Sequence, residues 1–299
     1  HGGRCTNVCP GGVATDFALE NGYGRTPDAL AGMMTAEDVA EVVLFCLTLT
    51  QGHWGVVDAP EFRQRFLIGL AVNVVLAIAA YATRGVGRSG AAVGTFLGTA
   101  IWAFAGAQAF ALLFAFFVLG TAATKLGYAR KAAAGIAQEK GGRRGPGNAL
   151  SKTSIPALAA VFAATTGYPE LFALALAGAF ATAAFDTVSS EVGKAYGRRT
   201  YLITTLRSVP RGTDGAVSLE GTVSGMAAAL LLAGLGAALD LYPAAGIVAV
   251  VVAAFLATTL ESVVGATLEK RGLLDNEAVN FLNSLAGALL AAAGGALLL

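Results

Sequence analysis

The amino-acid sequence predicts an all-α, polytopic membrane protein with about eight spanning helices, preceded by a short soluble segment. Two observations support this prediction. Hydrophobic residues make up 56% of the 299 residues and charged residues only 13%, whereas a soluble domain carries about 25% charged residues. Long runs without a charged side chain begin near residue 66, and a membrane-spanning helix needs about 20 such predominantly apolar residues.

The composition also excludes several functions. The net charge of +1 gives no reason to expect a nucleic acid as a partner. Cys5, Cys9 and Cys46 are not arranged with a C-x-x-C spacing, so neither a disulfide framework nor a zinc site is predicted. The two histidines, His1 and His53, precede the apolar part. Histidine-based catalysis or metal binding is therefore excluded there, while the oligomeric state is left open.

Residues 1–58 have the ordinary pattern of a soluble segment. Thr35 is a candidate N-cap, and Asp38 is placed for a capping box before an apolar helical stripe. The stretch TNVCPGGVATDF resembles the strand and Pro-Gly loop near the carboxyl end of short-chain dehydrogenases. The phosphate loop and the Tyr-x-x-x-Lys pair of that family lie upstream of such a fragment. We therefore expect a truncated remnant without its own activity, followed by a membrane domain over 59–299.

The charge-free runs and the Gly and Pro residues between them divide the membrane domain. The run 89–124 is twice too long for one helix, and Gly106 near its middle predicts a hairpin. The tripeptide GYP at 167–169 predicts a second hairpin. Several spans are rich in Gly and Ala, which favours close helix packing. The eight predicted spans are 65–83, 90–105, 107–126, 149–166, 169–188, 217–240, 243–265 and 279–298.

Basic residues fall into alternate loops of this arrangement. They lie between spans one and two, three and four, five and six, and seven and eight, whereas the loops near 106, 167 and 241 have none. The positive-inside rule makes the basic loops cytoplasmic. We therefore expect an integral protein of a bacterial cell membrane whose basic loops and active site face the cytoplasm.

The segment DTVSSEVGK, which opens with Asp186, is predicted at the cytoplasmic end of the fifth span. If the helix continues, Thr182, Ser189 and Ser190 share the face of Asp186, whereas Glu191 lies on another flank. Asp186 can simply mark a helix end at the lipid headgroups. Alternatively, it binds a divalent cation that carries a nucleotide or diphosphate, because ionisable groups in spans are commonly functional and Mg²⁺ prefers oxygen ligands.

The segment VPRGTDGAVSLEGTVSG leads into the sixth span. Glycines and small residues let a backbone approach phosphate oxygens, and a helix N-terminus favours anions. The alternative is an ordinary Gly-rich turn before a capped helix. The candidate phosphate-binding residues of this segment are Arg211, Gly212, Thr213, Asp214, Gly215, Ser218, Gly221 and Thr222.

Two further polar segments lie in basic loops. GGRRGPGNAL supplies Arg143, Arg144 and Asn148 just before the fourth span. Arginine pairs bind phosphate in a bidentate manner, although arginines beside a membrane also act as topology anchors. Glu261 lies at the end of the seventh span and Asn280 opens the eighth, so Glu261 is a second acid on the predicted active side.

Four segments, GRRGPGNAL, DTVSSEVGK, GTDGAVSLEGT and ESVVGATLEKRG with NEAVNFLN, carry a resemblance. From about residue 66 to the end, the chain resembles the integral membrane family that includes transmembrane protein 19 and plant phytyl-phosphate kinase. Glu261 stands where members of that family commonly have Asp, and Asn148 lies in a shortened form of its motif. The family more distantly resembles polyprenol kinases and CDP-lipid synthases, which use CTP and Mg²⁺ at the cytosolic face.

The resemblance implies phosphorylation of an isoprenoid monophosphate, such as phytyl or prenyl phosphate, by a nucleoside triphosphate, with CTP a candidate and Mg²⁺ as cofactor. Asp186 with Glu191 would hold the metal, and Asp214 would be a further catalytic acid. The predicted substrate- and phosphate-binding residues are Arg143, Arg144, Asn148, Ser190, Lys194, Arg211, Gly212, Thr213, Gly215, Ser218, Gly221, Thr222, Glu261 and Asn280.

Two other functions fit the same composition. A transporter or lipid-handling membrane protein also has short Gly-interrupted spans and intramembrane acids, but its polar residues line the middle of the membrane rather than one face. A cytidylyltransferase that forms a CDP-lipid would use the same metal and phosphate groups. The near absence of charge within the predicted spans favours the kinase over the transporter.

Overall fold

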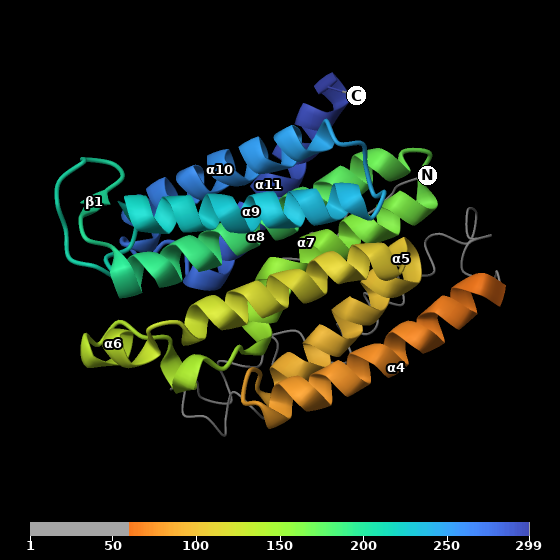
Figure 1. Ribbon diagram of the computed structural model, residues 1–299, viewed down its shortest axis with the longest axis horizontal. Helices are drawn as coiled ribbons and strands as arrows, with labels where there is room; N and C mark the ends of the chain where they lie inside the picture. Colours follow the sequence, from red (N-terminus) through yellow and green to blue (C-terminus); the bar gives the residue numbers. More distant parts are fainter. Residues whose placement is uncertain (1–59, 299) are drawn as a thin grey trace, which may run out of the picture. The chain divides into compact units, whose positions relative to one another are not determined.

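The computed structural model describes residues 60–298, so the predicted dehydrogenase-like segment 1–58 lies outside the described residues. The described part is an all-α polytopic membrane protein, as the sequence predicts (Figure 1). A 3₁₀ turn, Glu139–Gly142, precedes α7, and a π-helical turn, Gly265–Glu269, extends α10. The helices are α4 (Pro60–Ala82), α5 (Arg88–Lys125), α6 (Tyr128–Ala133), α7 (Pro146–Thr165), α8 (Pro169–Tyr196), α9 (Leu219–Ala238), α10 (Gly246–Val264) and α11 (Asn276–Leu298).

Each of the eight predicted spans corresponds to a helical segment of the structure. The hairpin prediction at Gly106 is confirmed, because this residue has a φ of 81° and interrupts α5. The two halves of α5 run back from this bend (Figure 1). Six helices among the described residues are long and apolar enough to cross a membrane, with α5 counted once. Of the helices at predicted spans, α7 is not among them, and it carries Lys152 and several hydroxyl residues in its first turns.

The loop between α8 and α9 contains a small sheet that the sequence prediction did not include. Strand β1 (Thr200–Leu202) pairs antiparallel with β2 (Ala216–Ser218), and Thr200 lies opposite Ser218. Three-residue strands are too short to produce a recognisable alternation of polar and apolar residues. The hairpin covers one end of α8 and brings the Gly-rich segment against the neighbouring helices.

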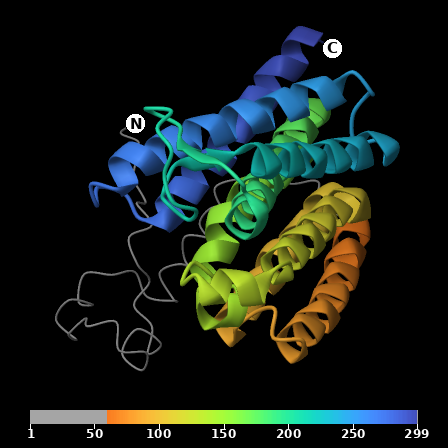
Figure 2. The same cartoon turned by 60° about the vertical axis from the view of Figure 1, so that its left-hand side comes forward.

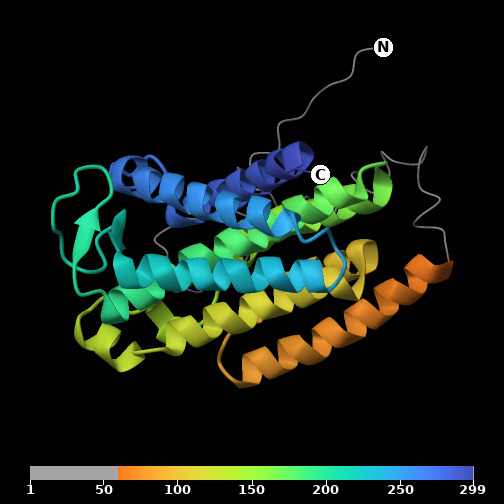
Figure 3. The ribbon, with the colours of Figure 1, turned by 45° about the horizontal axis from the view of Figure 1, so that its top comes forward.

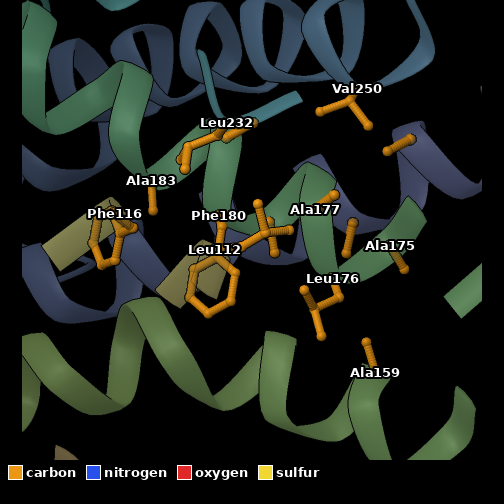
Figure 4. Close-up of a cluster of buried hydrophobic side chains, with 14 of the residues drawn as sticks. Leu112, Phe116, Ala159, Ala175, Leu176, Ala177, Phe180, Ala183, Leu232 and Val250 are labelled. Atoms are coloured by element: carbon orange, nitrogen blue, oxygen red, sulfur yellow. The ribbon is translucent and has the colours of Figure 1, made fainter. Parts of the chain in front are cut away.

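Helix α8 lies at the centre of the described helices, and α5, α7, α9, α10 and α11 pack around it (Figure 2). Its middle contributes Leu176, Ala177, Phe180 and Ala183 to an apolar core that side chains from the surrounding helices complete (Figure 4). Small residues permit this packing: a Cβ atom on Gly178 would lie 2.6 Å from the carbonyl oxygen of Gly287 on α11. Close helix approach through Gly and Ala is typical of membrane bundles.

Helix α4 packs against α5 at the edge of the helices (Figure 3) and leaves most of its apolar side chains exposed. Val75 and Ile78 are examples, with exposed fractions of 64% and 65%. In a membrane, such a surface faces lipid. The contrast between α4 and α8 therefore locates the protein interior, and with it the place where buried polar groups need partners.

The basic loops lie together at one end of the described helices, which we call the basic end (loops 83–87, 126–145, 197–218 and 265–275) (Figure 1). Direct contacts join these loops. The backbone N–H of Gly87 donates to the carbonyl of Arg144 at 3.1 Å, and Arg130 and Arg211 both donate to the carbonyl of Ala195. The predicted grouping of the basic loops is therefore confirmed. The assignment of this end to the cytoplasm remains a prediction.

Candidate functional site

Asp186 lies inside α8 rather than at its end. The predicted span 169–188 is too short, because α8 continues to Tyr196. Asp186 is 7% exposed, so it does not mark a helix end at the lipid headgroups, as the simpler of its two predicted roles requires. The hydroxyl and small residues after Asp186 remain helical since α9 packs closely along them: a Cβ atom on Gly221 would lie 2.5 Å from the carbonyl oxygen of Ser189.

Lys152 of α7 is the direct partner of Asp186. Its Nζ atom lies 2.7 Å from Oδ2 of Asp186 and 2.9 Å from Oγ1 of Thr187, and both charged side chains are buried. Ser190, one turn along α8, donates to Oδ1 of Asp186 at 3.4 Å. Buried charges require such partners, because an unpaired ion in an apolar interior is strongly unfavourable.

Glu261 brings a second carboxyl group to the same place. Its side chain lies on α10, within hydrogen-bonding reach of the Asp186 carboxyl group and within electrostatic range of Lys152. The consecutive helices α7 and α8 and the later helix α10 thus bring together two carboxyl groups and one ammonium group. We call Lys152, Asp186, Thr187, Ser190 and Glu261 the Asp186 centre.

Polar groups continue from the Asp186 centre towards the basic end. Lys194 is half-buried and follows Ser190 by one turn, so Asp186, Ser190 and Lys194 form a stripe on one face of α8. At the basic end, Glu269 lies within electrostatic range of Asp214, Asp275 and Asp186. Asn276 donates to Glu269, and Asn280 donates to Asn276. The arrangement offers a polar route from the loops to the centre.

Glu191 forms a separate ion pair on another flank of α8. Its partner is Lys131 of α6, which also donates to the carbonyl oxygens of Ala123 and Thr124. Both residues of this pair are almost fully buried. The expectation that Asp186 and Glu191 lie on different flanks of the helix is confirmed. A metal shared between them would require both ion pairs to break.

The donor set of the Asp186 centre can be compared with the predicted Mg²⁺ site. Among residues 60–298, no group of three or more His, Cys, Asp or Glu side chains is arranged to hold a metal ion. Mg²⁺ is commonly bound through one or two carboxylates together with substrate phosphates and waters. Asp186 and Glu261 supply two facing carboxyl groups and so fit this requirement, whereas Glu191 does not.

Arg144 is drawn into the protein, while its neighbour Arg143 is exposed. The Arg144 guanidinium lies over the rings of Phe116 and Phe117, at 5.4 and 5.9 Å from their centroids. Burial lowers the pKa of Arg144 to about 10, and the nearby carboxylates of Glu191 and Asp186 act in the opposite direction. Arg144 is therefore positively charged at neutral pH and adds a cation between the two ion pairs.

The residues of the Gly-rich segment have identifiable packing roles. Ser218 is the N-cap of α9 and accepts from the backbone N–H of Gly221 at 3.1 Å. Gly212 and Gly215 have φ values of 83° and 72°, which favour glycine. A Cβ atom on Gly215 would lie 2.5 Å from the carbonyl oxygen of Ser262 on α10. These contacts dock the loop on the helices, so Ser218 and the glycines have structural roles without a ligand.

The other predicted residues of this region differ in accessibility. Arg211 donates to the carbonyl of Ala195 at 3.4 Å, next to the carboxyl end of α8, where a cation is favourable. Thr213 donates to the carbonyl of Pro210 at 2.8 Å, and Asp214 is exposed. Thr222 and Asn148 are half-buried near the starts of α9 and α7. The exposed side chains of this set are therefore Arg211 and Asp214, whereas Thr213 is half-buried.

Sequence reasoning missed Lys152, which the structure places in direct contact with Asp186. The signal was present: Lys152 falls inside the predicted span 149–166, and an ionisable residue within a span indicates function by default. Lys131 falls in the predicted basic loop between the third and fourth spans. Its burial was not visible because residues 128–133 form a helix too short for a periodic pattern.

An apolar groove of about 350 Å³ lies between α5, α8 and α9. Val188 and Val192 of α8 line it together with alanines and leucines of the other two helices. These valines and Asp186 lie on different flanks of α8, given the helical repeat. The groove therefore does not open onto the Asp186 centre.

Comparison with known proteins supports membership of a membrane protein family. The membrane protein sll0875 of Synechocystis is 48% identical over 65% of this chain and 77% of its own length. Protein VTE6 of Arabidopsis thaliana, described as chloroplastic, is 40% identical over 69% of this chain, which spans 64% of that relative. The membrane protein MJ0933 of Methanocaldococcus jannaschii is 32% identical over 78% of this chain and 96% of its own length. No solved structure matches the chain.

The residues of the Asp186 centre lie within the matched part of the chain. The model of the family described as integral membrane protein DUF92 matches residues 71–288, which contain α7, α8 and α10 completely. This match covers well over half of the sequence. The chain therefore belongs to the DUF92 family of integral membrane proteins.

Proposed function

We propose that this protein transfers the terminal phosphoryl group of a nucleoside triphosphate, with CTP the first candidate, to an isoprenoid monophosphate such as phytyl or prenyl phosphate. The observation that carries the proposal is the Asp186 centre, in which two carboxyl groups and an ammonium group are buried among membrane helices. Ionisable groups in such a place are functional by default. The motif resemblance to the family that includes plant phytyl-phosphate kinase supports the substrate class.

The charges of the centre fit phosphoryl transfer. When bound, Mg²⁺ would neutralise the phosphate charges of the nucleotide, and catalysis of this reaction rests mainly on neutralisation and positioning. Asp186 and Glu261 are the residues that would hold it, in place of the predicted pair Asp186 and Glu191. Lys152 would attract the transferred phosphoryl group, because its ammonium group lies beside Asp186 at 2.7 Å.

The reaction needs no general base at the centre. A phosphate monoester has a second pKa near 6, so its attacking oxygen is already deprotonated at neutral pH. A new bond forms between this oxygen and the terminal phosphorus of the nucleotide, while the bond from that phosphorus to the bridging oxygen breaks. The products are an isoprenoid diphosphate and a nucleoside diphosphate, and no proton has to be removed by a side chain.

The nucleotide would approach from the basic end. Arg143 and Arg211 are exposed there, and Lys194 and Ser190 lie on the face of α8 that leads to Asp186. Arg144 would contribute positive charge from within the protein. The isoprenoid tail would lie among the lipid-facing helices, but the groove beside Val188 is not assigned to it because it lies on another flank of α8.

The position of a ³²P label in the nucleotide distinguishes a kinase from a cytidylyltransferase and from a protein without catalytic activity. Purified protein with Mg²⁺ would be given geranylgeranyl or phytyl monophosphate and either CTP or ATP, labelled with ³²P at the γ or the α position. We expect the γ label to appear in the lipid. Transfer of the α label would instead indicate a CDP-lipid-forming cytidylyltransferase, and no labelled lipid with any nucleotide would contradict both enzymatic functions.

A further inference from the structure

Hydroxyl groups in these helices usually bond to their own backbone. Thr124, Thr165, Ser224, Thr259 and Ser262 each donate to the carbonyl one turn earlier. The hydroxyl oxygens of Thr182, Thr258 and Ser284 are buried and have no hydrogen-bond partner among the described residues, and the same holds for Oδ1 of Asn283. We call these four residues, Thr182, Thr258, Asn283 and Ser284, the inner oxygen cluster.

Helix register places the first members of the cluster at one level. The side chain of Thr182 on α8 reaches Gly287 of α11, where a Cβ atom would collide with its hydroxyl oxygen. Helices α8 and α11 run in opposite directions (Figure 3). Asn283 and Ser284, one turn before Gly287, therefore lie beside the part of α8 between Thr182 and Asp186.

Thr258 reaches the same level from α10. It lies one turn from Phe255, whose ring is 6.2 Å from that of Phe185, and one turn from Glu261, which lies against Asp186. A Cβ atom on Gly294 of α11 would lie 3.2 Å from that of Ala249 on α10. Counting from this contact along the two antiparallel helices brings Thr258 level with Ser284.

The inner oxygen cluster therefore lies next to the Asp186 centre, on the side away from the basic end. All of its unpartnered atoms are oxygens, and they come from three neutral hydroxyl groups and one amide. The carboxyl groups of Asp186 and Glu261 and the ammonium group of Lys152 lie next to these oxygens. The four unpartnered oxygens need a partner in this interior, and a cation can take all four of them as ligands.

We propose that the inner oxygen cluster, together with the carboxyl groups of Asp186 and Glu261, binds one alkali-metal cation, Na⁺ or K⁺. Transition metals favour sites with nitrogen or sulfur ligands, and the inner oxygen cluster offers neither among its unpartnered atoms. Mg²⁺ binds mainly through carboxylates, phosphates and its own waters. Neutral oxygens in a buried place beside carboxyl groups suit a monovalent ion, and this inference does not depend on the proposed kinase activity.

Thermal unfolding of the full-length protein tests the site without Mg²⁺, nucleotide or lipid substrate. The unfolding temperature in detergent would be measured against increasing NaCl or KCl, with N-methyl-D-glucamine chloride keeping the ionic strength constant. We expect a saturable rise with Na⁺ or K⁺, since an ion that binds the folded state stabilises it by mass action. Equal unfolding temperatures in all three salts would overturn the proposal. They would indicate that water, rather than a cation, is the partner of the inner oxygen cluster.

Two adjacent threonines of α10 provide a matched pair of variants. Thr258→Val removes an unpartnered buried hydroxyl group, whereas Thr259→Val removes an exposed hydroxyl group that bonds to Phe255 of its own helix. Removal of a ligand should raise the half-saturating concentration of the cation at least about tenfold, while Thr259→Val should leave this concentration unchanged. Unchanged half-saturation in folded Thr258→Val would contradict the assignment. Asn283→Ala repeats the test on α11 should Thr258→Val fail to fold.

Discussion

Two buried ion pairs on α8 look alike and differ in their surroundings. The Lys152–Asp186 pair joins α8 to α7, and the Lys131–Glu191 pair joins it to α6. Lys131 is saturated by Glu191 and two backbone carbonyls of α5, and the pair fastens a short helix to the core, while Oε1 of Glu191 is buried without a partner among the described residues. Lys152 shares its charge between Asp186 and a second acid, Glu261. A buried ion pair with a second acid within reach indicates a binding centre, whereas one without a second acid indicates a structural link.

The largest effect is expected at Asp186. If phosphoryl transfer does not require Asp186, the two ion pairs do not differ in function. Asp186→Asn keeps the size of the side chain but removes charge that the proposed metal requires. We expect at least about 1,000-fold loss of phosphoryl transfer, which corresponds to about 4 kcal/mol, in a protein that still folds because the Glu261 carboxyl group remains within electrostatic range of Lys152. The matched control is Asp240→Asn, the same change in an exposed loop residue with a φ of 57° that asparagine also tolerates. Equal turnover in the two variants would remove Asp186 from the mechanism.

The Lys131–Glu191 pair should show the opposite behaviour. Glu191→Gln leaves the Lys131 ammonium group buried without its carboxylate, so we expect about 3 kcal/mol of destabilisation. The double variant Lys131→Met with Glu191→Gln should recover most of this loss, because no isolated charge remains. Thermal unfolding of the single and double variants measures the coupling. A folded double variant that has lost all phosphoryl transfer would show that Glu191 belongs to the reaction after all.

The packing of α9 on α8 near Asp186 should have a smaller effect. A Cβ atom on Gly225 would lie 2.7 Å from the ring of Phe185 and 2.8 Å from its carbonyl oxygen. Gly225→Ala should therefore cost about 2 kcal/mol of stability through overpacking. Gly234→Ala, on the same helix with no atom within 4 Å of the added Cβ, should be neutral or slightly stabilising. Equal unfolding temperatures for the two variants would mean that this helix contact is not tight.

Ser218 should give the smallest effect. Its hydroxyl group caps α9 at 3.1 Å from the Gly221 nitrogen, so Ser218→Ala should cost about 1 kcal/mol of stability. Ser218→Asn, which keeps a capping oxygen, should restore much of it. The KM for the nucleotide is the discriminating measurement: we expect it to be unchanged in both variants. An increase in KM without loss of stability would assign Ser218 to phosphate binding, as the motif alone predicts.

The fold was predictable to the extent that it depends on local composition. The apolar runs predict a helix at each of the eight positions, and Gly106 predicts the bend within 89–124, because glycine adopts a positive φ without steric cost. The length of α8 was not predictable in this way. The residues after Asp186 are polar and read as a loop, but packing against α9 and α6 keeps them helical to Tyr196.

The candidate site was predictable in parts but not as an assembly. Asp186 and Glu261 stand out because acids are rare in such a chain, and Lys152 carried the same signal. The family resemblance implies Glu191 as the second metal ligand beside Asp186, although helical spacing already places the two acids on different flanks. Their helical positions separate them, while Glu261, from a helix much later in the sequence, lies within reach.

The sequence by itself determined that this chain is a helical membrane protein and that its basic loops gather at one end, because hydropathy, charge and glycine position act locally. Only the tertiary structure decided which charges meet. Lys152 pairs with Asp186, and Lys131 with Glu191, since the packing of small residues around α8 fixes how the helices are rotated and how far they slide past one another. Such contacts depend on shape complementarity between distant segments, which no local pattern of residues encodes.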